Sequence, residues 1–285
     1  MRDIVVTGAS GQLGTAFRSH IPEARFLTRA DLDLSEPASI GPALERLDAA
    51  AIINCAAYTA VDAAEENDEM ALTVNGRAVS ALAGAADRAG IPFVTYSTDY
   101  VFDGSGTRPY VESDATNPIN AYGRSKLVGE RATLAHPGSL VIRTSWVISG
   151  THPNFVATML RLAQQRPLSV VDDQWGCPTI ASDLAGATLR AMEVGATGLL
   201  HLTNQGPTTW FELARTALEM GGLDPARLTP CATEDYPTPA RRPAYSVLTS
   251  ERLAALGMRP LPHWRASLTG VVAALLEVEG SGAGP

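Results

Sequence analysis

The sequence predicts an α/β protein in which a doubly wound parallel sheet is followed by a smaller, loop-rich C-terminal lobe. Three observations support this prediction. Short apolar, β-branched runs alternate with helical segments over the first 150 residues, a glycine-rich turn follows the first run, and prolines accumulate beyond Asn204. Strands that alternate with helices form parallel sheets covered on both faces. Such strands are continuously apolar, as these are.

The first strand is expected at 4–7, where Ile-Val-Val-Thr is apolar and β-branched, and a helix opens at Leu13 after the glycine-rich turn. The following strands are apolar runs separated by segments with helical spacing. After residue 150 this alternation loosens. The other expected strands are 25–28, 51–55, 93–97, 140–143, 168–171 and 201–203, and the expected helices are 37–47, 71–89, 154–165 and 181–194.

The composition narrows the class of protein. The 285 residues carry 22 Lys and Arg against 30 Asp and Glu, a net charge of −8, and 45% are apolar. This balance excludes a disordered chain and a general nucleic-acid binder, which needs excess positive charge. The three cysteines lie far apart without zinc-ligand spacing. No apolar run reaches the ~18 residues of a membrane span, and no signal peptide precedes the first strand, so we expect a cytoplasmic protein.

A glycine-rich turn, spaced GxxGxxG over Gly8, Gly11 and Gly14, joins the first strand to the first helix. At such a junction glycines allow a tight turn and a close approach of the backbone to a pyrophosphate, whose charge the helix N-terminus stabilises. The sheet is therefore interpreted as a Rossmann-like dinucleotide-binding domain. Residues of the turn expected to bind the cofactor are Gly8, Ser10, Gly11 and Gly14.

Domain boundaries follow from this interpretation. Seven prolines between Pro225 and Pro262 interrupt regular elements in the last part of the chain. The terminal glycine-rich segment has nothing to bury. The expected parts are the dinucleotide-binding domain at 1–150, to which 168–203 return, the substrate-binding lobe at 151–167 and 204–280, and a frayed tail at 281–285.

The end of the second strand bears on the choice of cofactor. The dinucleotide-binding fingerprint has an acid there, which binds the ribose diol, whereas this sequence has Arg29. A cation can meet a 2′-phosphate, so Arg29 favours NADPH. Asp33 and Leu34 lie just beyond and could flank the adenine instead, which leaves NADH open.

Tyr122 and Lys126 are spaced i and i+4, so a helix places both on one face. Pro118 and Asn120 supply helix-start chemistry just before them. A phenol titrates at about pH 10 in water, but a nearby ammonium and the positive nicotinamide of an oxidised cofactor lower its pKa. Such a phenol can give a proton to a carbonyl oxygen while a hydride reaches the carbon.

Further candidate residues lie near strand ends and in the proline-rich segment. Either Ser97 or Thr98, at the end of the fourth strand, is expected to hold the carbonyl oxygen. Trp146 could pack on a sugar face. Arg241 and Arg242 could clamp a diphosphate, because guanidinium groups meet phosphate oxygens in pairs.

Five segments carry a family resemblance: Cys55–Asp62 (CAAYTAVD), Tyr96–Gly104 (YSTDYVFDG), Arg143–Val147 (RTSWV), Asp173–Thr179 (DQWGCPT) and Pro239–Pro243 (PARRP). Together they resemble the dTDP-4-dehydrorhamnose reductases, a family of the extended short-chain dehydrogenases/reductases. The resemblance covers nearly the whole chain. It implies NADPH-dependent reduction of the 4-keto group of dTDP-4-dehydro-6-deoxy-L-mannose to dTDP-L-rhamnose.

By this resemblance Thr98 is the catalytic hydroxyl, Tyr122 the proton donor, and Lys126 its tuning group and a nicotinamide-ribose ligand. Some family members have an acid in place of Arg29 and accept NADH well. Some family members bind magnesium through glutamates at a dimer contact. This sequence has no matching acidic cluster, so no metal is expected. Whether the chain forms a homodimer is left open by the sequence. The resemblance also implies contacts to pyrophosphate from Gly11, Gln12 and Leu13, to the cofactor groove from Ala57, Tyr58 and Thr59, and to the dTDP-sugar from Val61, Asp99 and Trp146. Ala56 is expected to bind the cofactor as well, and Thr98 and Arg242 the substrate.

The alternative functions are a sugar-nucleotide dehydratase or epimerase, another reductase and a non-catalytic subunit. Dehydratases of this superfamily resemble the pattern Thr-Asp-Glu after the fourth strand, whereas here Tyr100 follows Thr98 and Asp99, which disfavours dehydration. A reductase of another dTDP-keto-sugar, in a secondary-metabolite pathway, stays open. A non-catalytic regulatory subunit that binds NADP is the third, since a regulatory subunit of methionine adenosyltransferase resembles this family. The intact Thr98, Tyr122 and Lys126 favour turnover.

Overall fold

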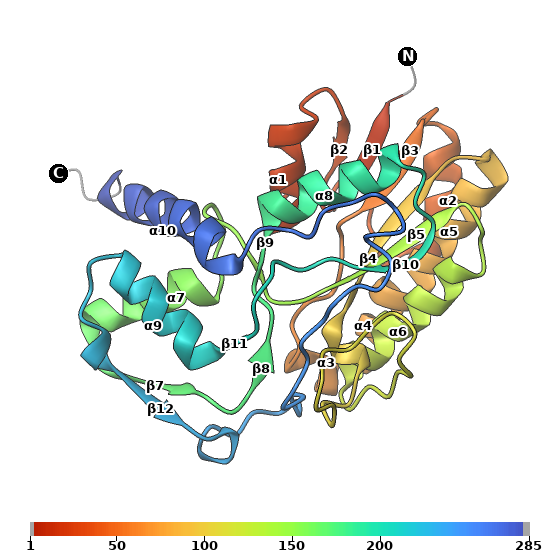
Figure 1. The fold of residues 1–285 in the computed structure, drawn as a ribbon. Helices are drawn as coiled ribbons and strands as arrows, with labels where there is room; N and C mark the ends of the chain where they lie inside the picture. Colours follow the sequence, from red (N-terminus) through yellow and green to blue (C-terminus); the bar gives the residue numbers. More distant parts are fainter. Residues whose placement is uncertain (1–2, 282–285) are drawn as a thin grey trace.

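A six-stranded sheet lies at the centre of the larger part of the computed structural model, which describes residues 3–281 (Figure 1). Its strands run in the order β10-β5-β4-β3-β1-β2, and every neighbouring pair is parallel. The predicted doubly wound α/β class is therefore confirmed. The strands are β1 (Ile4–Thr7), β2 (Arg25–Leu27), β3 (Ala51–Asn54), β4 (Phe93–Thr98), β5 (Ser139–Thr144) and β10 (Gly198–His201).

Both faces of the sheet are covered because successive strand residues point to opposite sides. Val6 and Ile53 pack toward α1 (Gln12–His20) and α8 (Ala181–Glu193). Their neighbours Val5 and Ile52 pack toward the opposite layer. The fully apolar strands predicted from the sequence thus each serve two cores. The helices of the opposite layer are α2 (Pro37–Glu45) and α5 (Ala78–Ala89), with α6 (Ala121–Leu134) packed beside α5.

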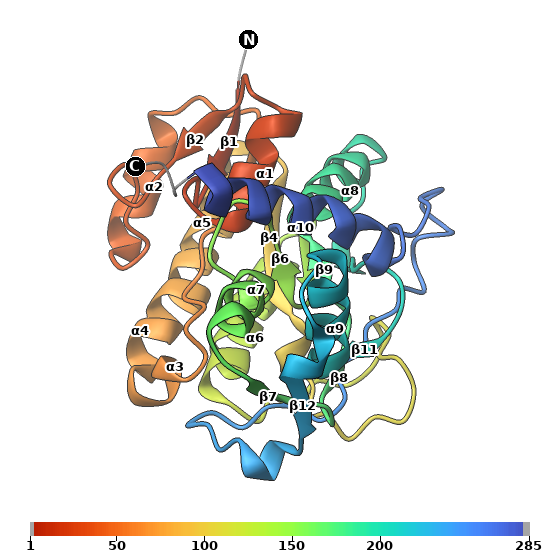
Figure 2. The ribbon, with the colours of Figure 1, turned by 90° about the vertical axis from the view of Figure 1, so that its left-hand side faces the viewer.

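A smaller lobe lies beside the sheet and has its own apolar core. Figure 2 views the molecule from this side, with the lobe helices in front of the sheet. Trp264 and Leu213, from segments far apart in the chain, are both fully buried in this core. The elements of the lobe are α7 (Phe155–Gln165), α9 (Trp210–Met220), α10 (Trp264–Ser281), and β7 (Leu168–Val171), which pairs with β12 (Leu228–Cys231).

The lobe differs from the sequence prediction in two respects. β7 pairs with β12 and lies outside the central sheet, so the expected return of 168–203 to the sheet domain applies to α8 and β10 alone. The segment expected to be loop-rich contains α9 and α10, because the prolines gather between these two helices rather than within them. Of the predicted tail, Ser281 ends α10 and 282–285 lie outside the described residues.

The helix predicted at 71–89 is divided in the structure. A π-helical turn, η1 (Thr73–Arg77), separates α4 (Asp68–Leu72) from α5. Turns of this kind are rare, and those that occur often lie at functional sites. The side chain of Asn75 leaves this turn toward the end of the sheet that carries the site described below.

Shorter elements complete the chain. None of the helices in the described part of the chain is long and apolar enough to cross a membrane. The short strands pair with one another in two-stranded sheets that are separate from the central sheet. These elements are α3 (Ala63–Glu66), η2 (Asp99–Val101), β6 (Val147–Ile148), β8 (Trp175–Gly176), β9 (Thr179–Ile180), β11 (Thr208–Thr209), η3 (Pro225–Arg227) and η4 (Thr233–Asp235).

Candidate active site

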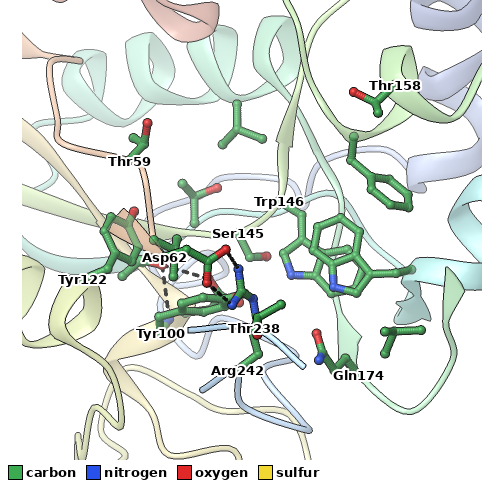
Figure 3. Close-up of a pocket in the computed structure, with 18 of the residues that line it drawn as sticks. Thr59, Asp62, Tyr100, Tyr122, Ser145, Trp146, Thr158, Gln174, Thr238 and Arg242 are labelled. Carbon is green, nitrogen blue, oxygen red and sulfur yellow. Dashed lines mark hydrogen bonds and ion pairs between the residues drawn. The ribbon is translucent and has the colours of Figure 1, made fainter. Parts of the chain in front are cut away.

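Two adjoining cavities lie at the carboxyl ends of the central strands. The first, of about 650 Å³, lies against the glycine-rich turn and is called the glycine-loop cavity. The second, of about 680 Å³, lies between the sheet and the smaller lobe and is called the lobe cavity (Figure 3). Ligands of parallel sheets bind at this end of the strands. Both cavities are lined by Gln12, Thr59, Ser97, Tyr122, Thr144 and Val147.

The glycine-rich turn is built for close approach of a ligand to the backbone. Gly8 has φ +68°, and a Cβ there would lie 2.6 Å from the amide nitrogen of Ala56. α1 begins directly afterwards, with Gly11 as its N-cap and no side chain capping its first amides. These free N–H groups and the positive end of the helix fit an anionic group. The arrangement matches the pyrophosphate of a dinucleotide.

Nearly all residues predicted to bind the cofactor line the glycine-loop cavity. The exception is Gly14, which packs beneath the turn against the carbonyl oxygen of Gly8. At the far wall the exposed Arg29 pairs with Asp33, with Nε 3.3 Å from Oδ2. Hydrogen bonds from Ser35 and the charge of Arg29 lower the pKa of Asp33. The predicted residues that line this cavity are Gly8, Ser10, Gly11, Gln12, Leu13, Arg29, Asp33, Leu34, Ala56, Ala57, Tyr58, Thr59, Tyr122 and Lys126.

Tyr122 and Lys126 lie in the first turns of α6, as the i, i+4 spacing predicted. Asn120 caps this helix by accepting a hydrogen bond of 2.7 Å from the Gly123 amide. Tyr122 faces both cavities, whereas the buried Lys126 lines only the glycine-loop cavity. The phenol thus stands where a dinucleotide and a second ligand would meet.

The surroundings keep the phenol of Tyr122 protonated. Burial raises its pKa, the nearby Asp99 carboxylate raises it further, and a hydrogen bond with Thr98 acts in the opposite direction. A protonated phenol is what a proton donor requires. Burial lowers the pKa of Lys126 to about 8, although Glu130 acts in the opposite direction. Tuning of Tyr122 by Lys126 stays a prediction.

Three hydroxyl groups at the ends of β4 and β5 line cavities that Tyr122 also lines. Thr98 donates to Asp99 Oδ1 at 2.9 Å and accepts from the Tyr100 amide at 3.1 Å. The buried hydroxyls of Ser97 and Thr144 line both cavities, and neither has a hydrogen-bond partner among the described residues. Because unpaired buried polar groups are rare, these two indicate a polar ligand at the junction of the cavities.

The lobe cavity contains the residues predicted to bind a substrate. Val61, Asp99, Trp146 and Arg242 line it, and the exposed Arg241 does not. Burial raises the pKa of Asp99 to about 6, against the hydrogen bonds that it accepts from the hydroxyls of Ser246 and Thr98. A buried carboxylate at this position makes the floor of the cavity both polar and acidic.

Comparison with known proteins identifies the family of this chain. The model of the family described as "RmlD substrate binding domain" matches residues 1–277. The chain belongs to the dTDP-4-dehydrorhamnose reductase family. A relative of that name from Mycobacterium tuberculosis is 43% identical over 283 residues, which cover 95% of this chain and 92% of the relative. A Streptomyces niveus protein, named dTDP-4-keto-6-deoxy-D-glucose reductase, is 39% identical over 93% of this chain and 94% of its own.

Solved structures agree with this family assignment. A dTDP-4-dehydrorhamnose reductase from Clostridium acetobutylicum has a TM-score of 0.91 at 35% identity, covering 96% of this chain and 99% of its own. One from Bacillus anthracis, determined in complex with NADP, has a TM-score of 0.89 at 32% identity, covering 97% and 100%. The chain is thus similar to reductases over nearly its whole length.

Several residues of this reductase-family site were not predicted from the sequence. Asn75, in the π-helical turn, holds the backbone of Tyr58 through both its oxygen (2.9 Å) and its nitrogen (3.0 Å), and donates to Ser125 Oγ at 3.0 Å. It thereby ties a wall of the glycine-loop cavity to the helix of Tyr122. The sequence signal was an asparagine within an alanine-rich helix, where it is unfavourable without such partners.

Two tryptophans form an aromatic wall of the lobe cavity, and only Trp146 was predicted from the sequence. The rings of Trp146 and Trp210 stack with centroids 3.5 Å apart. Trp146 has the left-handed backbone conformation, φ +46°, which is rare for a bulky residue. Gly176 lies against its ring, since a Cβ there would come 2.5 Å from Trp146 Cε2. The stack therefore fixes one indole in a strained position facing the cavity.

Gly123 fixes how closely the helix of Tyr122 approaches the sheet. A Cβ at this position would lie 2.1 Å from the carbonyl oxygen of Tyr100. In Gly123→Ala we expect α6 to move away from η2, with a loss of about 1–3 kcal/mol in the free energy of unfolding. Urea denaturation measures this loss. Gly138→Ala is the control, because a Cβ at Gly138 meets no atom within 4 Å; equal effects of both variants contradict the prediction.

Proposed function

We propose that this chain uses NADPH to reduce the 4-keto group of dTDP-4-dehydro-6-deoxy-L-mannose, giving dTDP-L-rhamnose. The observation that carries the proposal is the position of Tyr122, a protonated phenol at the junction of the two cavities. The names of the relatives and the NADP complex of one of them support it.

In this proposal the glycine-loop cavity holds the dinucleotide. The first amides of α1 bind the pyrophosphate, and Lys126 binds the nicotinamide ribose. The hydroxyls of Ser97 and Thr144 have no hydrogen-bond partner in the described chain. In this proposal they form hydrogen bonds with the nicotinamide end of the dinucleotide. When bound, NADPH supplies a hydride.

The lobe cavity holds the dTDP-sugar in the same proposal, and the smaller lobe is its substrate-binding domain. Tyr122 gives its proton to the 4-keto oxygen as that carbon is reduced, and solvent then restores the phenol. Thr98 orients the oxygen, for which its hydroxyl must turn from Asp99. Trp146 packs on the sugar and Arg242 meets the diphosphate, so binding of the remote nucleotide aligns the reacting ketone.

The reaction itself is the direct test. Mixing the protein with NADPH and dTDP-4-dehydro-6-deoxy-L-mannose is expected to remove the absorbance of the reduced nicotinamide and to yield one equivalent of dTDP-L-rhamnose. Absence of consumption, together with tight binding to a methionine adenosyltransferase, would support the non-catalytic alternative. A size-exclusion measurement with light scattering tests the homodimer that the family resemblance left open.

A second candidate substrate is dTDP-4-keto-6-deoxy-D-glucose, which is named in the Streptomyces niveus relative. That relative is about as similar to this chain as the rhamnose-forming ones. A panel of dTDP-keto-sugars separates the two candidates by kcat/KM. Preference for the gluco-configured ketone overturns the first proposal and leaves NADPH-dependent reduction in place.

Arg29 is proposed to bind the 2′-phosphate of NADPH. The residue lines the glycine-loop cavity with an exposed guanidinium that Asp33 holds at 3.3 Å. In Arg29→Asp a carboxylate would instead repel the phosphate beside Asp33, so we expect the NADPH/NADH ratio of kcat/KM to fall by about 10- to 100-fold. Steady-state kinetics with both cofactors measure this ratio. An unchanged ratio removes Arg29 from cofactor selection.

A further inference from the structure

The lobe cavity contains a pre-formed ion pair. Arg242 is the only cationic residue among the described residues that line this cavity. Its two terminal nitrogens donate to the two oxygens of Asp62 at 2.6 and 2.7 Å, the two-pronged geometry that guanidinium groups also adopt with phosphate (Figure 3). The group on which a diphosphate would rely is therefore already engaged by a carboxylate.

The two partners belong to different parts of the fold. Asp62 precedes α3, next to the sheet, and Arg242 lies in the loop that follows η4. The amide of Ala240 also donates to Asp62, at 3.1 Å, and the carbonyl oxygen of Ala240 accepts from Arg242 at 2.7 Å. The Arg242 side chain lowers the pKa of Asp62, so the carboxylate is ionised at neutral pH.

The loop does not depend on this ion pair for its position. The side-chain amide of Asn120 donates to the carbonyl oxygen of Arg241 at 2.9 Å. Pro243 packs so closely on Gly104 that a Cβ there would lie 2.6 Å from it. Because the backbone is held on both sides of Arg242, the guanidinium can change its partner without displacement of the loop.

Electrostatic repulsion prevents Arg242 from pairing with Asp62 and with an anionic ligand at the same time. A diphosphate that enters the cavity meets a guanidinium neutralised by Asp62, with the second carboxylate of Asp99 on the cavity floor. Two anions that compete for one edge of a guanidinium repel each other strongly in a partly buried site. A neutral nucleoside has no group that competes for this edge.

We propose that Asp62 is an affinity-lowering residue, which occupies the phosphate-binding edge of Arg242 and must yield it when a nucleoside diphosphate binds. This inference rests on the proposed function, in which the lobe cavity takes a dTDP-sugar. It assigns to Asp62 a role opposed to binding: the carboxylate weakens the affinity for a nucleoside diphosphate and leaves the affinity for the uncharged nucleoside unchanged.

Calorimetric titration of dTDP and of thymidine into the full-length protein tests the inference. In Asp62→Asn we expect the Kd of dTDP to fall about tenfold, because the amide no longer competes as an anion, while thymidine binding stays unchanged. The asparagine oxygen can still accept from the Ala240 amide, so the loop keeps that anchor. Unchanged or weaker dTDP binding in Asp62→Asn overturns the inference.

Asp114→Asn is the matched control. Asp114 makes an equally two-pronged pair with Arg108, at 2.7 and 2.9 Å, but neither residue lines the lobe cavity. This variant removes the same charge from the protein, and its dTDP affinity is expected to equal that of the wild type. An equal gain in both variants shows a net-charge effect and overturns the inference.

A crystal structure with dTDP gives a second readout. We expect the Arg242 nitrogens on phosphate oxygens and more than 4 Å from Asp62; an intact pair with dTDP bound overturns the inference. Failure of the proposed function has a different signature. If the wild type binds no dTDP and consumes no NADPH with the keto-sugar, the function itself is wrong, whereas turnover without a gain in Asp62→Asn removes the role of Asp62 alone.

Discussion

Tyr122→Phe is expected to lower kcat for keto-sugar reduction by about 10²–10⁴-fold, the range that a positioned general acid contributes. The substitution removes one oxygen from the junction of the two cavities and leaves the ring, which stacks edge-on against Tyr100 with centroids 6.0 Å apart. NADPH affinity, measured by fluorescence titration, is expected to change little. The loss should therefore appear in kcat rather than in KM.

Tyr245→Phe is the control for this prediction. It makes the same chemical change at a tyrosine that lines neither cavity. Its kcat is expected to equal that of the wild type. If Tyr122→Phe retains more than a tenth of the wild-type kcat, another group supplies the proton, and Asp99, with its pKa of about 6, is the next candidate.

Lys126→Met is expected to reduce kcat/KM for NADPH by at least about 100-fold without lowering stability at pH 7. The activity falls because the proposed ribose contact and the proposed tuning of Tyr122 are both removed. Stability is retained because burial opposes the charge of Lys126, as its lowered pKa of about 8 shows. A methionine of similar length fills the same space without a buried charge.

The pH dependence of stability follows from the same pKa. The unfolded lysine titrates near its ordinary value of 10.5 and the folded one at about 8. Between these values the unfolded chain binds more protons, so the wild type gains stability as the pH rises through this window. Thermal melts should show Lys126→Met at or above the wild-type Tm at pH 7, with the difference narrowing toward pH 10. A variant that melts well below the wild type at pH 7 contradicts this account.

Local sequence patterns were sufficient to predict most elements of the sheet domain. β1 and β3 are apolar up to their last residues, Thr7 and Asn54, and the glycine spacing after β1 allows few other structures. Tyr122 and Lys126 were found because helical spacing alone places them on one face. These features depend on neighbours within a few residues, which a sequence displays directly.

The remainder depends on contacts between distant segments. The pair of Asp62 with Arg242 joins residues 180 positions apart, and the stack of Trp146 on Trp210 joins two segments with no shared pattern. α10 was missed because the prolines before it dominated the local signal, while the burial that stabilises it comes from α7 and α9. The missed site residues are those that tertiary packing defines.

The two cavities share few lining residues. The residues that select one ligand can therefore change without altering the cavity of the other ligand. Lys126 and Arg29 line only the glycine-loop cavity, whereas Trp146, Trp210 and Arg242 line only the lobe cavity. Mutations in the lobe can therefore reshape sugar selectivity in evolution, or in enzyme engineering, without disturbing hydride chemistry. Successive substrates could be recruited to the lobe cavity while the glycine-loop cavity stays the same.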